Sequence, residues 1–209
     1  MYRALMFAAL VFLAGIVSVL IHELGHCLFY WLQGVPAAMS FVKEFPLRNI
    51  TASEYAVGSA GGPFANVVLV GLSIWLYKKY QNRDTLRTIF SAFILANVFY
   101  FVLRGLIALL KRRGGELGDV AGLIGLGYVP VVVLFGTISV GALYYWMKLG
   151  GIRFSLRTVG SFVALLVGYV IVMVGMESID SKLFWHRFPT IQIDDGRTYN
   201  EPIVRDHSG

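Results

Sequence analysis

The sequence predicts an all-α polytopic membrane protein with about five transmembrane helices, a short re-entrant helix and a small β-hairpin near a candidate active site. Hydrophobic residues make up 57% of the 209 residues and charged residues only 14%. The mean hydropathy is +0.69. A water-soluble protein could not cover its surface with so few charges, whereas a lipid bilayer accommodates this composition. Long apolar runs separated by short polar loops complete the pattern.

The formal net charge of +6 has a different meaning here from the one it would have in a soluble protein. The basic residues lie mostly in short loops between apolar runs, as membrane orientation signals do. We therefore expect a bilayer as the surrounding partner, and no nucleic acid. The single cysteine, Cys27, excludes an intrachain disulfide framework.

The first apolar run extends from Ala4 to Leu32. At about 1.5 Å per residue it can span a bilayer with some tilt, and it is too long for the apolar part of a signal peptide. It contains the motif H-E-x-x-H at residues 22–26. On a helix, His22 and His26 share one face and can bind one metal ion, while Glu23 can take a proton from a water beside that metal. This is half of a zinc hydrolase site.

The cost of burying charge and the small residues beside the motif both bear on whether His22, Glu23 and His26 are functional. Ionisable side chains inside a membrane span are costly, which favours a functional role. The alternative is that the histidines hydrogen-bond to neighbouring helices. Gly15, Ser18, His22 and Gly25 fall along a similar helical face, so we expect other helices to approach closely there.

Residues 34–57 lose the long apolar character. Residues 39–42 and 49–52 read as two short strands around a turn at 43–46, so we expect a hairpin on the same side of the membrane as the end of the first helix. An irregular interfacial loop is the alternative.

The second helix is expected over residues 58–77. It opens with glycines and a proline, which permit close helix packing, and it contains Asn66. In hydrocarbon this amide needs a partner, either an interhelical hydrogen bond or a catalytic contact.

The remaining elements follow from the apolar runs. A third helix is expected over 88–110, with Arg104 reaching the water at its end. A basic loop at 111–115 precedes a short or re-entrant helix at 116–122 with Asp119 near its start. Helices at 128–147 and 158–176 complete the integral domain, residues 1–176, of which 5–126 form the core and 127–176 are accessory. Residues 177–209 form a polar tail expected to lie outside the hydrocarbon.

Counting the crossings puts the end of the first helix, the start of the second and Asp119 on one side of the membrane. A catalytic zinc usually has three protein ligands and one open position. Asp119 is the predicted third ligand; helix capping is its alternative role, and Glu116 is a rival carboxylate.

These motifs resemble the site-2 protease family of intramembrane zinc metalloproteases. The resemblance rests on the H-E-x-x-H motif at 22–26 and on Gly61-Gly62-Pro63-Phe64-Ala65-Asn66, which is similar to the family's glycine-proline-asparagine signature. Gly118-Asp119-Val120 stands where the family usually has an Asp-Gly pair. The resemblance covers roughly residues 5–126. It implies a membrane-embedded protein substrate, clamped by the hairpin as an added strand.

The expected chemistry is peptide hydrolysis. Zn²⁺ held by His22, His26 and Asp119 would activate a water whose proton Glu23 accepts, with Asn66 assisting at the oxyanion. The alternatives are a catalytically silent membrane scaffold of the same fold and, less favoured, a metal-ion transporter. We expect a multi-pass protein of the cell membrane, with room for a membrane partner that regulates access. The basic residues are nearly balanced between the two sides and do not set the orientation.

Overall fold

The computed structural model describes residues 2–111, 115–152 and 155–199. Five of its helices contain stretches long and apolar enough to cross a membrane. They are α1 (Tyr2–Leu32), α2 (Ala52–Lys79), α3 (Asp84–Lys111), α5 (Tyr128–Gly150) and α6 (Leu156–Leu183). The prediction of a mostly helical chain with five such helices is confirmed, which is compatible with a membrane protein.

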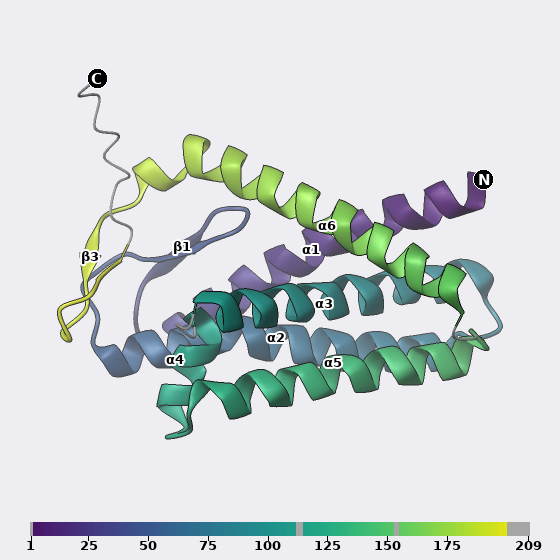
Figure 1. The fold of residues 1–209 in the computed structure, drawn as a ribbon. Helices are drawn as coiled ribbons and strands as arrows, with labels where there is room; N and C mark the ends of the chain where they lie inside the picture. Colours follow the sequence, from purple (N-terminus) through teal and green to yellow (C-terminus); the bar gives the residue numbers. More distant parts are fainter. Residues whose placement is uncertain (1, 112–114, 153–154, 200–209) are drawn as a thin grey trace.

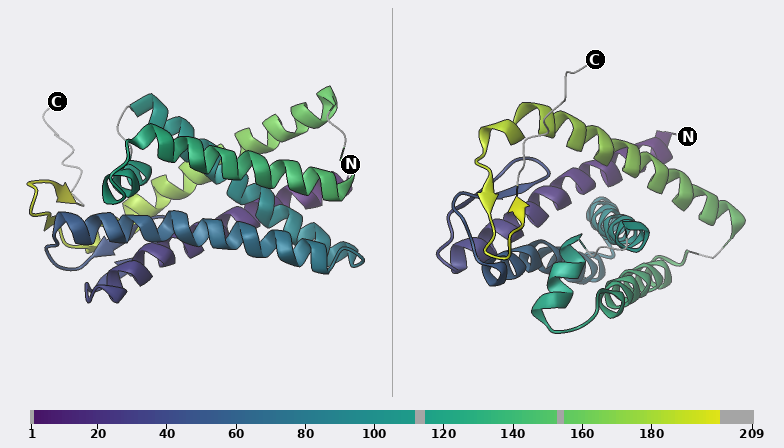
Figure 2. Two further views of the ribbon diagram at one scale, coloured as in Figure 1. Left: turned by 90° about the horizontal axis from the view of Figure 1, so that it is seen from below. Right: turned by 60° about the vertical axis from the view of Figure 1, so that its left-hand side comes forward.

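Helix α3 lies at the centre of the bundle. It packs against α1, α2 and α5, and its residues Ile94, Leu95 and Ala96 are fully buried. Helix α6 lies on the opposite side of α3 from α5, where it crosses α1 (Figures 1 and 2). It is the least buried of the five helices. Its contact with α1 is close, because Tyr169 of α6 packs where a side chain at Gly15 would lie.

The short helix α4 (Gly115–Leu123) does not run the length of the bundle. It packs against α2 and α5, at the end where α1 finishes and α2 begins (Figure 1). Three segments that are far apart in the sequence therefore meet at one end of the bundle, as counting the crossings predicted.

A β-hairpin follows α1, but its strands are not the predicted ones. β1 (Ala37–Met39) pairs antiparallel with β2 (Glu44–Pro46), so the residues predicted as the turn form the second strand. The predicted second strand, residues 49–52, instead contains Ile50, which forms a parallel bridge with Ile193. The second strand does not form as predicted because residues 51–54 make a capping box. This box starts α2 at Ala52 rather than at the predicted residue 58.

The segment after α6 folds back over this hairpin. Helix α6 continues past Met176, its predicted end, to Leu183. A 3₁₀ turn (η1, Trp185–Arg187) and a second hairpin follow, made of β3 (Ile191–Gln192) and β4 (Thr198–Tyr199). Residues 112–114 of the predicted basic loop and residues 200–209 of the predicted tail lie outside the described residues.

Candidate metal centre

The two histidines of the motif meet on one face of α1, as their spacing predicts. Both are fully buried. Their Nε2 atoms lie 2.9 Å apart, and the two rings meet edge to face. In a tetrahedral zinc site with Zn–N bonds of about 2.05 Å, two nitrogens lie about 3.3 Å apart. The imidazoles are therefore close to the arrangement that binds one ion.

Glycines of α2 make room for this pair. A Cβ atom at Gly62 would overlap the Nε2 atoms of both His22 and His26. One turn away along the interface, a Cβ at Gly25 would lie 2.5 Å from the carbonyl oxygen of Gly61. The predicted close packing of small residues is confirmed. Its consequence is that the backbone of α2 forms one wall of the site.

The backbone of α2 also orients His26. Its Nδ1 lies 2.9 Å from the carbonyl oxygen of Gly58 and 3.2 Å from the backbone nitrogen of Gly62. One ring nitrogen cannot donate to the first and accept from the second at once. The shorter contact, in which Nδ1–H donates to Gly58, leaves the lone pair on Nε2, which is the tautomer that a metal requires.

Tyr100 and Arg104 of α3 act on His22. Arg104 Nε donates to the Tyr100 hydroxyl oxygen at 3.0 Å, and this hydroxyl lies 2.9 Å from His22 Nε2. With its oxygen accepting from Arg104, Tyr100 is set to donate its proton to His22. The Nε2 atoms of His22 and His26 thus lie 2.9 Å apart beside the Tyr100 hydroxyl. Two imidazole nitrogens at this spacing are a donor set that fits a metal ion such as zinc.

Arg104 was expected only to reach the water at the end of its helix. Its hydrogen bond to Tyr100 instead ties it to the histidine site. Neither residue was a predicted site residue. The signal that could have found them is a tyrosine and an arginine four residues apart, on one face of an otherwise apolar helix.

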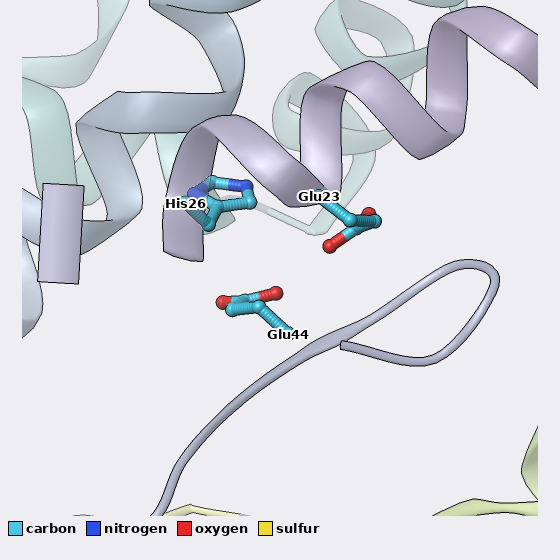
Figure 3. A group of neighbouring side chains, drawn as sticks. All are labelled: Glu23, His26 and Glu44. Atoms are coloured by element: carbon cyan, nitrogen blue, oxygen red, sulfur yellow. The ribbon is translucent and has the colours of Figure 1, made fainter. Parts of the chain in front are cut away.

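Two buried carboxylates stand beside the histidines. Glu23 of α1 is 2% exposed and Glu44 of β2 is 8% exposed. One oxygen of each, together with a ring nitrogen of His26, all lie within 4.8 Å of one another. Figure 3 shows Glu44 on the hairpin facing Glu23 and His26 across a gap. Glu23 is where the motif predicts it; Glu44 was expected only within a turn.

A tyrosine from the far end of the chain fixes Glu44. The hydroxyl of Tyr199 in β4 donates to Glu44 Oε1 at 2.9 Å, with the main-chain oxygen of Glu44 at 3.2 Å. Burial, and next the charge of Glu44, raise the pKa of Tyr199 well above its ordinary value. The phenol therefore stays protonated and remains a donor.

The hairpin is held by further contacts with the C-terminal segment. The buried carboxylate of Asp180 accepts hydrogen bonds from Ser40 Oγ at 2.5 Å and from the Phe41 amide at 3.0 Å. The rings of Phe45 and Phe188 stack with centroids 3.8 Å apart. These pairs are about 140 residues apart in the sequence, so no local sequence pattern predicts them.

Lys43 sits above a group of aromatic rings. Its Nζ lies 4.3 Å from the ring centroid of Trp185 and 4.8 Å from that of Tyr199. Burial lowers the pKa of this amine, while the charges of Glu44 and Glu23 oppose that shift. The Lys43 amine thus lies over these rings and near enough to Glu44 and Glu23 for their charges to act on it.

Asn66, the predicted substrate contact, is fully buried on α2, one turn after Gly62. Among the described residues, neither its Oδ1 nor its Nδ2 has a hydrogen-bond partner. The interhelical hydrogen bond considered for it is therefore not formed within the described part of the chain. A buried amide left in this state favours a ligand as its partner.

Asp119, the predicted third ligand, lies on α4. Its carboxylate forms an ion pair with Arg197 at 3.3 Å. Within the described ranges, the group of three metal-binding side chains is Glu23, His26 and Glu44, and Asp119 is not among them. The side chain of its rival, Glu116, lies outside the described residues.

A cavity of about 380 Å³ opens beside the two carboxylates, within the range of ligand-binding cavities. Its polar lining includes Glu23, Glu44, Tyr100 and Arg104, and its apolar lining comes largely from α1, α3 and α6. The cavity thus joins the candidate metal centre to a space that can hold water and a peptide.

Comparison with known proteins gives no further guidance: no family model, no curated protein and no solved structure matches this chain.

Proposed function

We propose that this protein is an intramembrane zinc metalloprotease that hydrolyses a peptide bond in or near a transmembrane segment of its substrate. The observation that supports this most strongly is the convergence of the His22 and His26 Nε2 atoms, 2.9 Å apart, with Glu23 buried beside them on a helix of membrane-spanning length. The resemblance of the H-E-x-x-H and Gly-Gly-Pro-Phe-Ala-Asn motifs to site-2 proteases supports the same function.

His22 and His26 would hold the zinc ion, with a carboxylate as third ligand; Asp119 is the one predicted from the sequence. When bound, zinc would lower the pKa of a water molecule and polarise the peptide carbonyl. Glu23 accepts the proton of the attacking water and passes it to the leaving amine. Asn66 and Tyr100 are the chain's own donors for the negative charge that develops on the carbonyl oxygen.

A transmembrane substrate must unwind before its peptide bond is accessible, and unpaired backbone groups in lipid cost several kcal/mol each. β1 and β2 form a two-stranded sheet beside the cavity. An unwound segment that pairs with a free strand edge would recover those hydrogen bonds. We therefore propose a membrane-embedded protein as substrate and the cell membrane as location. A second membrane protein that regulates access of the substrate to the cavity would fit this site.

The test is to compare cells that produce the wild type with cells that produce Glu23→Gln, by mass spectrometry of protein N-termini in the membrane fraction. We expect new N-termini within or next to transmembrane segments in the wild-type cells and none in the Glu23→Gln cells. The substitution keeps size and polarity while removing the base. An identical set of N-termini in both would contradict the proposal.

The second candidate function is a catalytically silent membrane scaffold. The observation that favours it is the ion pair of Asp119 with Arg197, which occupies the carboxylate predicted to bind metal. Under this alternative, purified wild-type protein would lack zinc after incubation with the metal. Cells that produce Glu23→Gln would then show the same protein N-termini as wild-type cells.

A further inference from the structure

The proposed zinc centre needs a third protein ligand, and the inference here rests on that proposed function. His22 and His26 supply two nitrogens from one helix. A third donor has to come from another element, on the side that faces both imidazoles. In a hydrolytic site this donor is usually a nitrogen or a carboxylate oxygen.

We infer that Glu44, on strand β2, is the third metal ligand of this chain. An oxygen of its carboxylate, an oxygen of Glu23 and a ring nitrogen of His26 lie within 4.8 Å of one another. Among the described residues this group does not include His22, whose Nε2 lies 2.9 Å from Nε2 of His26. Ligand atoms around one zinc ion are about 3.3 Å apart, so an approach of about 1.5 Å would bring the Glu44 carboxylate into range of the His26 nitrogen. The close-up of the three side chains shows Glu44 reaching from the hairpin towards α1 (Figure 3).

Burial gives an independent reason. Glu44 is 8% exposed and Glu23 is 2% exposed, and two carboxylates this close and this buried repel each other. Lys43 offsets part of that repulsion, but its amine lies over the rings of Trp185 and Tyr199. A divalent cation between the carboxylates and the imidazoles offsets the rest.

The contacts of Glu44 are those of a fixed metal ligand. Tyr199 donates to its Oε1 at 2.9 Å. Ligating carboxylates are typically held by such outer hydrogen bonds, which set their orientation. This bond orients the carboxylate and leaves its remaining lone pairs to face the ion. Tyr199 is thus a positioning residue, acting through Glu44.

Glu23 and Glu44 then have different roles. Glu23 follows His22 directly on α1, about 100° round the helix, which is the position of a general base in this motif. Glu44 approaches from a separate element, as a ligand must if the ion is to be enclosed. Asp119 is instead paired with Arg197, which keeps α4 joined to the C-terminal segment.

β2 is held in place by Tyr199 and by the stack of Phe45 on Phe188. The segment after α6 therefore controls the position of the third ligand. Zinc affinity should therefore fall when the contacts between the hairpin and the C-terminal segment are lost.

The experiment measures the Kd for Zn²⁺ by competition with a chromogenic chelator, on full-length protein purified in detergent at pH 7. The variants are Glu44→Gln, Asp119→Asn and Glu23→Gln. Loss of an outer hydrogen bond to a ligand costs about 10- to 100-fold in metal affinity, so loss of the ligand itself should cost at least about 100-fold. We expect that loss in Glu44→Gln alone. Thermal unfolding of the metal-free variants checks that all three are folded.

Tyr199→Phe separates positioning from folding, because it removes only the hydroxyl. We expect zinc binding about 10-fold weaker than wild type and metal-free protein of similar stability. Zinc affinity unchanged in Glu44→Gln and weakened in Asp119→Asn would overturn the inference and leave the proposed function intact. Absence of zinc binding in the wild type would overturn both.

Discussion

The hydroxyl group of Tyr100 on α3 lies 2.9 Å from Nε2 of His22 on α1. Arg104, one turn further along α3, donates to the same hydroxyl oxygen. These two hydrogen bonds connect the cavity lining, which includes Tyr100 and Arg104, to the histidine pair. If His22 held a metal ion through Nε2, the Tyr100 hydroxyl would be left to donate to another acceptor in the cavity, such as the substrate carbonyl.

Tyr100→Phe should therefore slow catalysis without removing the metal. Loss of one donor to a developing oxyanion lowers kcat by about 10²- to 10³-fold, and we expect an effect of this order or somewhat smaller. The measurement is kcat on a cleaved substrate together with zinc content. The matched control is Tyr169→Phe, since Tyr169 is a buried tyrosine on α6 whose hydroxyl has no hydrogen-bond partner among the described residues. Equal rates for both variants would remove Tyr100 from the mechanism.

Gly62→Ala should abolish zinc binding, because the added methyl group would occupy the space of both imidazoles. Gly71→Ala is the control on the same helix, since a Cβ atom there meets no other atom within 4 Å. We expect zinc content near zero in the first variant and unchanged in the second. Full zinc content in Gly62→Ala would mean that α2 does not form the wall of the metal site.

Asn66→Ala should have opposite effects on stability and activity. Removing a buried amide without a partner leaves the thermal unfolding temperature unchanged or raises it. Activity should fall by about 10²-fold if the amide donates to the oxyanion. In contrast, Asn97→Ala should lower the unfolding temperature, because Asn97 donates to Ser18 Oγ at 3.0 Å and to the Phe93 carbonyl oxygen. A destabilised Asn66→Ala would indicate a purely structural amide.

Asp180→Ala should loosen the hairpin. Hydrogen bonds to a charged group contribute about 1.5 to 3 kcal/mol each, and Asp180 accepts them from Ser40 and Phe41. We expect hydrogen exchange at the amides of residues 37–45 to become at least about 10-fold faster. Asp84→Ala, at an exposed ion pair on α3, should leave that exchange unchanged. No difference between the two variants would show that Asp180 does not hold the hairpin.

Apolar runs and one motif were enough to predict the helices and the histidine pair. Helix α1 closely matches the predicted run, and its small residues meet other helices as expected: Gly15 packs on Tyr169 and Gly25 on Gly61. Such predictions succeed because helix length and residue spacing are local properties. The capping box at Thr51 and Glu54 was equally local, and it would have given the start of α2.

The features that were missed depend on distant contacts. The hairpin register differs from the prediction because Ile50 bridges to Ile193 and Asp180 binds the loop after β1. Glu44 became a candidate ligand only when β2 was placed opposite α1. Three-residue strands carry too little pattern of their own to fix their partners.

The most direct test of the proposed metal centre is the zinc content of detergent-purified protein, compared among wild type, Glu23→Gln and His22→Ala. We expect about one zinc per chain in the wild type and in Glu23→Gln, and none in His22→Ala, because in the proposed site His22 binds the metal while Glu23 only moves a proton. Zinc retained in His22→Ala at the wild-type level, or absent from the wild type after incubation with Zn²⁺, would contradict it.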